Sequence, residues 1–330
     1  MGYKILEIGT YVGSTQTDSE FFVEHFKKQG KDIKHFMDDV MGRTSVCTSK
    51  DKNTLEMAYE AVDEALDKNH LKGEEIDMII FVSSFPEYTV PPNAIAIHQH
   101  INGSQGAICF DLNGNCTGMW DAIEMARCKI ELSQAYKRAL IVGSECFSLS
   151  TSEDDEIFYG QFADTACAVI IEKTNDSSGT VAFSGYVDNT ELDTAFLPDK
   201  GFSNLLKQDD LTKEDLWVKY YHDRAHFSAS QVGVDQITSL LKESNISIED
   251  IKVACLAQNN INTIKFVANA IGIDIEKCPF PGKHIGYTGA SCNLFALKEA
   301  VDKKMVQRGD LVLFWAIGMG VSSVCSIIRY

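Results

Sequence analysis

Hydrophobic positions along the chain follow two spacings, and together they predict layers of strands and helices. Continuous apolar runs of the kind found in strands buried on both faces occupy residues 76–82, 138–145, 162–171, 251–257 and 310–317. A first strand is expected over 3–9 and a last one over 324–329. Between the runs, apolar residues recur at helical spacing, which predicts helices over 19–28, 51–69, 94–101, 120–130, 228–243, 261–271 and 291–304. Buried strands alternating with amphipathic helices are typical of α/β sheets covered by helices.

A polar, turn-rich stretch at residues 172–180 separates two halves of this pattern. Each half alternates strands with helices and ends in a strand, although the halves show no obvious sequence repeat. We therefore expect an N-terminal half over 1–174 and a C-terminal half over 175–330. The region from about 188 to 226 is poorly periodic, and 31–42 is less regular than its neighbours.

Charge and hydropathy argue against functions at nucleic acids and membranes. The chain has 330 residues and a formal net charge of -17, which argues against binding to nucleic acid or to an anionic membrane surface. No apolar run approaches membrane-spanning length, and the N-terminal segment becomes polar too soon for a signal peptide. We expect a cytoplasmic protein.

The ten cysteines are expected to be free thiols, because a cytoplasmic location disfavours disulfides. No C-x-x-C pair occurs, so neither a zinc nor an iron–sulfur site is predicted. G-x-G-x-x-G and Walker-type loops are also missing from the sequence, and we expect no bound cofactor.

The strongest chemical candidate is Cys116. An apolar strand runs into the turn-prone residues 111–115, Cys116 follows, and a helix begins near Gly118. At the start of a helix, the dipole and the free amides favour a thiolate. The alternative is that Cys116 is a small buried apolar residue, and the spacing alone does not decide between the two.

Three segments resemble one enzyme family. Residues 107–118 resemble the nucleophile segment of the β-ketoacyl-ACP synthase III group, within the thiolase-like condensing enzymes. Residues 160–166 are similar to the strand entry G-D-G-A-G-A of that family, and 308–320 to its C-terminal strand and glycine turn. The landmarks occur in family order over nearly the whole chain. The resemblance implies a five-layered αβαβα thiolase-like fold of two pseudo-repeated halves, and a dimer with the active site near the interface.

The resemblance also implies acyl transfer. Cys116 would attack an acyl-CoA or acyl-carrier-protein (ACP) thioester to give an acyl-enzyme, with the oxyanion held by the amides of Cys116 and Gly320. The family uses a histidine and an asparagine to decarboxylate a malonyl thioester, and those positions hold Gln258 and Tyr287 here. Both side chains donate hydrogen bonds, but neither is a base at neutral pH, so decarboxylative condensation is in question.

His284 is the nearest spare histidine. The run His284-Ile285-Gly286 resembles the H-x-G of divergent family members that act as acyltransferases, in which a histidine of this loop is the base for an alcohol, amine or thiol acceptor. One interpretation is therefore a Cys–His pair with Cys116. The other is a histidine that hydrogen-bonds to the backbone of its own loop.

The positions of the family's adenine clamp, a tryptophan and two arginines, fall on Phe36, Val40 and Leu149. Because the arginines are replaced, a nucleotide phosphate loses its bidentate partners, which favours a carrier protein or another thioester over free coenzyme A. An acidic carrier needs a local basic patch. Candidate cations, interleaved with acids, are Lys207, Lys213, Lys219 and Arg224.

Two functions of different classes follow. The first is a thiolase-fold acyltransferase or condensing enzyme of fatty-acid or polyketide-like biosynthesis, acting through Cys116 with help from His284, Gln258 and Tyr287. The second is a catalytically impaired partner subunit of a heteromeric ketosynthase, which the replaced histidine and asparagine favour. Thiolysis or hydrolysis of the same acyl-enzyme is a third possibility. A homodimer is expected, and a heterodimer is the alternative.

Overall fold

The strands form two main sheets in the computed structural model, which describes residues 2–221 and 228–330. The first sheet has the order β1 (Gly2–Ile5), β8 (Asp164–Thr174), β7 (Arg138–Cys146), β5 (Met78–Val82) and β6 (Ile108–Leu112), and β2 (Gly9–Val12) also pairs with β8. β5 runs parallel to β6 and β7, whereas β8 is antiparallel to β1, β2 and β7. β6, which leads to Cys116, therefore lies at one edge of this sheet.

The second sheet has the order β12 (Ile251–Cys255), β13 (Leu311–Gly318), β14 (Ser322–Arg329) and β9 (Gly179–Val187). β12 and β13 are parallel, and β13 and β14 form a hairpin. The chain passes from the first sheet to the second between Thr174 and Gly179. This crossing lies in the polar stretch found in the sequence, while the division into domains at 174/175 stays a prediction.

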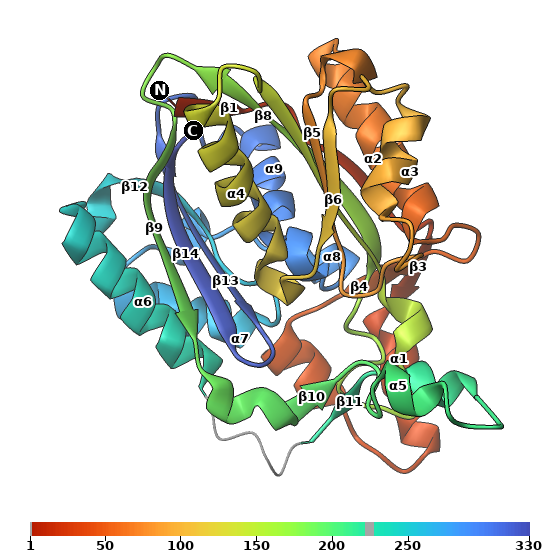
Figure 1. Cartoon of the computed structure of the whole chain (residues 1–330). Helices are drawn as coiled ribbons and strands as arrows, with labels where there is room; N and C mark the ends of the chain where they lie inside the picture. The colour runs from red at the N-terminus through yellow and green to blue at the C-terminus, as the bar shows by residue number, and fades with distance from the viewer. Residues whose placement is uncertain (1, 222–227) are drawn as a thin grey trace.

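Helices complete five layers (Figure 1). α4 (Gly118–Leu132) and α9 (Cys292–Asp302) lie between the two sheets. α2 (Thr54–Asn69) and α3 (Asn93–His100) cover the outer face of the first sheet, and α6 (Ala229–Ser244) and α7 (Ile261–Ile271) cover that of the second. Residues of β5 alternate between the layers: Met78 and Ile80 face the central helices, and Ile79 and Phe81 face α2 and α3. The strand thus needs apolar side chains on both faces, as its continuous apolar run predicts.

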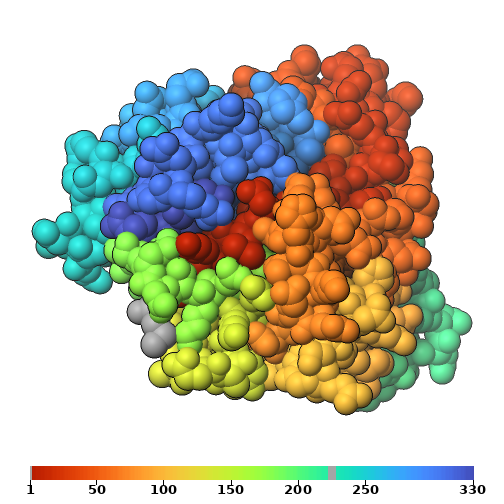
Figure 2. Space-filling model, turned by 90° about the horizontal axis from the view of Figure 1, so that it is seen from above, coloured from red at the N-terminus to blue at the C-terminus, as the bar shows by residue number. Residues whose placement is uncertain are grey.

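The predicted strand over 3–9 is wrong. β1 and β2 are separate short strands that pair with different parts of β8, and residues 6–8 lie between them. A view from above shows the red N-terminal strand between the C-terminal half, in blue, and the orange residues of the first half (Figure 2). Arg308 fixes this position, because its guanidinium donates to the carbonyl of Ile5 over 2.7 Å.

The remaining elements are short. The segment β3 (Thr15–Asp18), α1 (Ser19–Lys28) and β4 (Ser45–Thr48) packs around a small apolar cluster, and the irregular region 31–42 holds a π-helical turn, η1 (Phe36–Met41). The poorly periodic region contains β10 (Ala195–Phe196), α5 (Phe202–Leu205) and β11 (Lys219–Tyr220). A further one-turn helix is α8 (Gly282–Ile285). Short 3₁₀ turns are η2 (Gly73–Glu75), η3 (Asn115–Thr117), η4 (Phe147–Ser150), η5 (Asn189–Thr194), η6 (Lys213–Leu216), η8 (Ile248–Asp250), η9 (Ile275–Lys277) and η10 (Gly289–Ser291).

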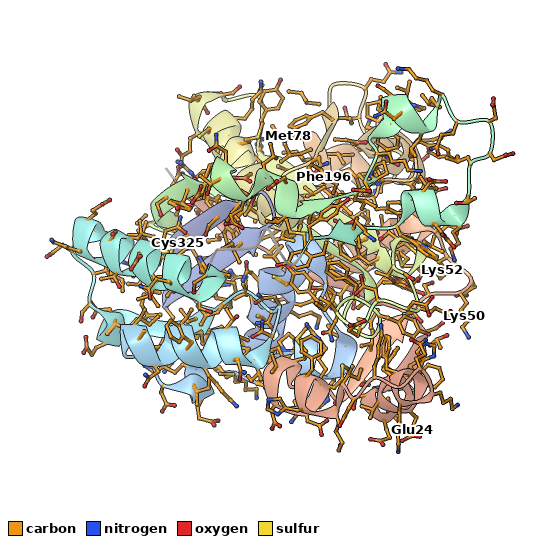
Figure 3. The ribbon with its side chains drawn as sticks, turned by 90° about the horizontal axis from the view of Figure 1, so that it is seen from below. Glu24, Lys50, Lys52, Met78, Phe196 and Cys325 are labelled. Atoms are coloured by element: carbon orange, nitrogen blue, oxygen red, sulfur yellow. The ribbon has the colours of Figure 1, made fainter. Side chains whose placement is uncertain are left out.

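Charged side chains lie at the periphery, as a view from below shows for Glu24, Lys50 and Lys52 (Figure 3). Met78 and Cys325, labelled in the same view, are buried. None of the helices in the described residues is both long enough and apolar enough to span a bilayer.

Candidate active site

The nucleophile candidate lies on a tight turn between β6 and α4. Cys116 is half-buried in η3, directly before the first residue of α4. The turn needs a glycine at position 114, because a Cβ there would lie 2.6 Å from Cα of Gly118. Thr117 closes the turn: its hydroxyl is 2.8 Å from the carbonyl oxygen of Gly114 and 2.9 Å from Oδ2 of Asp121. The sequence prediction of a cysteine on a turn at a helix start is confirmed.

Asn115 contacts both polar groups of Cys116. Its Oδ1 accepts a hydrogen bond from the amide of Cys116 over 2.8 Å and one from the thiol over 3.2 Å. Its Nδ2 donates to the carbonyl of Met319 over 3.2 Å. Asn115 has a φ of 53°, a left-handed conformation that asparagine tolerates better than most residues.

The turn between β13 and β14 lies against the nucleophile. A Cβ on Gly318 would lie 3.2 Å from the amide nitrogen of Cys116, a tighter contact than most side chains make, so the glycine favours this close approach. Around Gly320, in contrast, a Cβ would meet no atom within 4 Å. The structure thus places Gly318 against the backbone of Cys116. The role of the Gly320 amide in an oxyanion hole stays a prediction.

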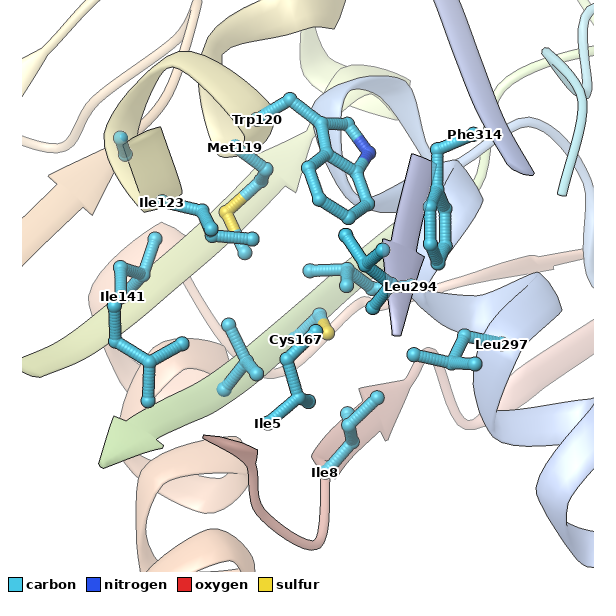
Figure 4. Packing of buried hydrophobic residues seen from close by; sticks show 14 of the residues in the cluster. Ile5, Ile8, Met119, Trp120, Ile123, Ile141, Cys167, Leu294, Leu297 and Phe314 are labelled. Carbon is cyan, nitrogen blue, oxygen red and sulfur yellow. The ribbon is translucent and has the colours of Figure 1, made fainter. Parts of the chain in front are cut away.

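Aromatic packing holds this turn and α4 together. Trp120, on the first turn of α4, packs against Phe314 of β13 with ring centroids 4.2 Å apart (Figure 4). Both side chains are about 1% exposed. At the other side of the turn, the amides and carbonyls of Asp188 and Val321 form a reciprocal pair of hydrogen bonds of 2.6 and 2.9 Å. The start of α4 is therefore packed against β13, the strand that leads into the glycine turn.

The structure brings Tyr287 to Cys116. The backbone of Tyr287 bonds to Gln161 and Ala163, over 2.7 and 2.9 Å, which inserts the residue beside the start of β8. Its buried side chain hydrogen-bonds to the thiol of Cys116, an interaction that lowers the pKa of the thiol. Burial has the larger effect and raises the pKa of Cys116 to about 12.

In the resting site, burial therefore outweighs the groups that favour a thiolate. Removal of the thiol from water disfavours the charged form by more than the hydrogen bonds from Tyr287 and the backbone stabilise it. Burial also holds the pKa of Tyr287 well above its usual value. Both groups are protonated at neutral pH.

Gln258 does not point a free amide at the thiol. Its side chain is buried, and Nε2 donates to the carbonyls of Leu256 and Pro279 over 2.9 and 3.1 Å. Oε1 is 3.5 Å from the amide of Gly282. The side chain therefore joins the end of β12 to the loop that leads to Tyr287.

His284 is exposed and lies on the β4 side of this loop. Its Nδ1 is 2.9 Å from Oγ1 of Thr44, and its backbone carbonyl accepts from the hydroxyl of Ser45 over 2.6 Å. In the described part of the chain, the thiol of Cys116 bonds to Asn115 and Tyr287 and not to His284. The structure does not bring the predicted Cys–His pair together.

Sequence reasoning missed Arg43, which is only 2% exposed. The guanidinium donates to Oε1 of Gln161 over 3.0 Å, and to the carbonyls of Gly282, Gln258 and Asn259 over 2.8, 3.1 and 2.7 Å. Burial lowers the pKa of Arg43 to about 10, and the groups that oppose this shift are Tyr287 and Cys292. An arginine in a polar loop gives no sequence signal of such burial.

Glu145 and Cys292 complete the surroundings of the thiol. Glu145 is 2% exposed and accepts from the hydroxyl of Ser83 and the amide of Ser84 over 3.1 and 2.9 Å. Burial raises the pKa of Glu145 to about 7, and its charge in turn raises that of Cys116. Cys292, buried at the start of α9, also raises the pKa of Cys116. The sequence carried one signal for Glu145: it is an acidic residue that ends the apolar run 138–145.

The residues at the predicted donor-binding positions lie in η1 and η4. Leu149, at one adenine-clamp position, is 48% exposed, and Phe36 and Val40 lie in η1. Lys219, one of the candidate docking cations, lines a hollow of about 810 Å³ in which acidic residues outnumber the lysines. The surface at this lysine is thus not basic, and Arg224 lies outside the described residues.

Comparisons with known proteins agree with this architecture. The family profile of 3-oxoacyl-[acyl-carrier-protein] synthase III matches residues 110–197, and that of its C-terminal part matches 241–330. The β-ketoacyl-[acyl-carrier-protein] synthase III of Clostridium perfringens strain SM101 is 26% identical over 329 residues, which cover 99% of this chain and 98% of the relative.

Solved structures share the fold over the full length. 3-Oxoacyl-[acyl-carrier-protein] synthase III from Aquifex aeolicus superposes with a TM-score of 0.87 at 22% identity and covers 100% of both chains. Xanthomonas campestris OleA, with lauric acid and lauroyl-CoA bound, gives 0.85 at 13% identity, covering 100% of this chain and 99% of the other. The five layers are therefore a thiolase-like fold, and the chain belongs to the β-ketoacyl-ACP synthase III family of acyltransferases among the thiolase-like condensing enzymes.

Proposed function

We propose that the protein transfers an acyl group from a carrier thioester through an acyl-enzyme on Cys116. Sγ of Cys116 attacks the thioester carbonyl carbon, and the new C–S bond forms as the bond to the carrier sulfur breaks. The carrier leaves as a thiol, with the proton that Cys116 loses. The acyl group then passes to an incoming nucleophile.

The observation that carries this proposal is the convergence on Cys116 of the glycine turn and Tyr287. The close approach of Gly318 brings the glycine turn to the amide of Cys116, and backbone amides at such a place can stabilise an oxyanion. Tyr287 lies on the thiol and lowers its pKa. We assign the oxyanion to the amide of Cys116 and one from this turn, with Gly320 as the predicted donor.

Gln258 supports transfer without decarboxylation. Both hydrogens of its amide are used by backbone carbonyls, so the group has no donor left for a malonyl thioester. His284 is exposed beside the same loop, where it is available to an acceptor that binds at the surface. The donor is proposed to be an acyl carrier protein, because Phe36, Val40 and Leu149 provide no cation for a nucleotide phosphate.

Intact-mass spectrometry tests the acyl-enzyme. The protein is incubated with acyl-CoA and acyl-ACP donors of several chain lengths, and the adduct is mapped by peptide digestion. We expect one acyl group, which is lost in Cys116→Ala and kept in Cys128→Ala, the matched control for an exposed thiol. Release of CO₂ from malonyl-ACP would contradict transfer without decarboxylation.

A second candidate is an impaired partner subunit of a heteromeric ketosynthase. The protonated resting state of Cys116 and the engaged amide of Gln258 favour it. This function predicts no adduct from any donor, and a gain of activity when the protein is mixed with a complete synthase from the same cell. An adduct on Cys116 from the protein alone would contradict it.

A further inference from the structure

Oδ1 of Asn115 occupies the position that the carbonyl oxygen of a thioester would take during acylation. A thioester carbonyl oxygen must accept a hydrogen bond from the amide of Cys116, and this amide already donates to Oδ1 of Asn115 over 2.8 Å. The same oxygen accepts from the thiol over 3.2 Å. A neutral amide carbonyl resembles a thioester carbonyl in charge and shape, so Asn115 makes the contacts of a bound substrate.

The side chain is also held at its other end. Nδ2 donates to the carbonyl of Met319 over 3.2 Å, and a Cβ on Gly318 would lie only 3.3 Å from Cγ of Asn115. The carboxamide therefore bridges the nucleophile turn and the glycine turn, the two segments that would provide the oxyanion donors. The residue is only half-buried, so part of its side chain faces solvent.

We propose that Asn115 is a built-in plug of the oxyanion site, which must rotate away before Cys116 is acylated. This inference rests on the proposed function of Cys116. At rest, Oδ1 holds the amide and keeps the proton on the thiol, since a carbonyl oxygen stabilises the S–H form and repels a thiolate. When a thioester carbonyl displaces Oδ1, the amide is freed for the oxyanion and the thiol loses its acceptor in the same movement. Asn115 is thus a positioning residue that couples substrate entry to activation of the thiol.

The test is the reactivity of Cys116 in Asn115→Gly. Glycine removes the carboxamide and adopts the φ of 53° without strain. Asn245→Gly is the matched control, because Asn245 has a φ of 54° at the end of α6. All variants carry Cys128→Ala to remove the exposed thiol. Rates are measured for alkylation by iodoacetamide between pH 6 and 10, and for acylation by acyl-ACP.

We expect Asn115→Gly to react about five- to tenfold faster in both assays, the effect of losing the hydrogen bond between the thiol and Oδ1. Asn115→Asp, which keeps the shape and adds a negative charge beside the thiol, should react at least tenfold more slowly. Asn245→Gly should match the parent protein. Faster alkylation of Asn115→Gly without acylation of any variant would support the plug and overturn the proposed function. If the parent protein is acylated at least as fast as Asn115→Gly, the plug is contradicted and the proposed function stands.

Discussion

Arg43 is predicted to be a main support of the site, and Arg43→Met tests this. The guanidinium makes four hydrogen bonds, all to neutral oxygens, in three segments that carry site residues. Methionine fills a similar volume with no donor. The substitution therefore leaves four oxygens without their partner in a region from which water is excluded.

The magnitude follows from two opposing terms. A hydrogen bond from a charged donor contributes about 1.5–3 kcal/mol, so four of them contribute roughly 6–12 kcal/mol. Burial of a guanidinium without a carboxylate costs several kcal/mol, which the substitution recovers. The difference between these two terms gives an expected net loss of about 3–5 kcal/mol in the free energy of unfolding.

Urea unfolding followed by tryptophan fluorescence measures this loss. Arg43→Lys keeps the charge but has three donors on one nitrogen, so it should fall between the parent and Arg43→Met. Arg329→Met is the control, because this arginine donates one 3.1 Å hydrogen bond to the carbonyl of Gly309 near the surface and should lose less than about 1 kcal/mol. A stability of Arg43→Met within about 0.5 kcal/mol of the parent would refute the reasoning.

Three further predictions concern buried side chains near the thiol. Burial raises the pKa of Glu145 to about 7, so the folded state holds a proton that the unfolded state releases near pH 4.5. The free energy of unfolding should therefore fall by about 3 kcal/mol as the pH rises from 4.5 to 7. Glu145→Gln should lack this fall in pH-dependent unfolding, and an unchanged slope of stability against pH would contradict the assignment. Tyr287→Phe removes a hydrogen bond that lowers the pKa of Cys116, so iodoacetamide should alkylate the thiol about fivefold more slowly at pH 8. An equal or faster rate of alkylation would argue against the contact between Tyr287 and the thiol. Trp120→Ala should reduce the free energy of unfolding by about 3–5 kcal/mol in urea titrations, because it opens a cavity against Phe314, and a loss below about 1 kcal/mol would mean that the site collapses onto it.

The sequence predicted a helix or strand correctly where one local signal determines it. The helix at 261–271 has the predicted bounds, because Asn260 caps its first turn and Gly272 ends it in a left-handed conformation. The buried strands were found because burial on both faces requires unbroken apolar runs. The strand predicted over 3–9 failed because pairing with a distant partner, β8, decides where each strand begins.

The site was predictable in its nucleophile segment and not in its surroundings. Cys116 on a turn before a helix is a local pattern, whereas the contacts of Arg43 join segments more than 200 residues apart. The thiol's pKa depended on burial, which a helix-start argument does not include. His284 is exposed because its one-turn helix directs the side chain toward Thr44, a contact that only the folded chain reveals.

The raised pKa of Cys116 has a consequence for the lifetime of the protein. With a pKa of about 12, roughly one thiol in 10⁵ is ionised at pH 7. Peroxides oxidise cysteine through the thiolate, so the resting nucleophile is a poor target for conversion to sulfenic acid. A cell under oxidative stress would lose the exposed Cys128 to oxidation before Cys116, the proposed nucleophile.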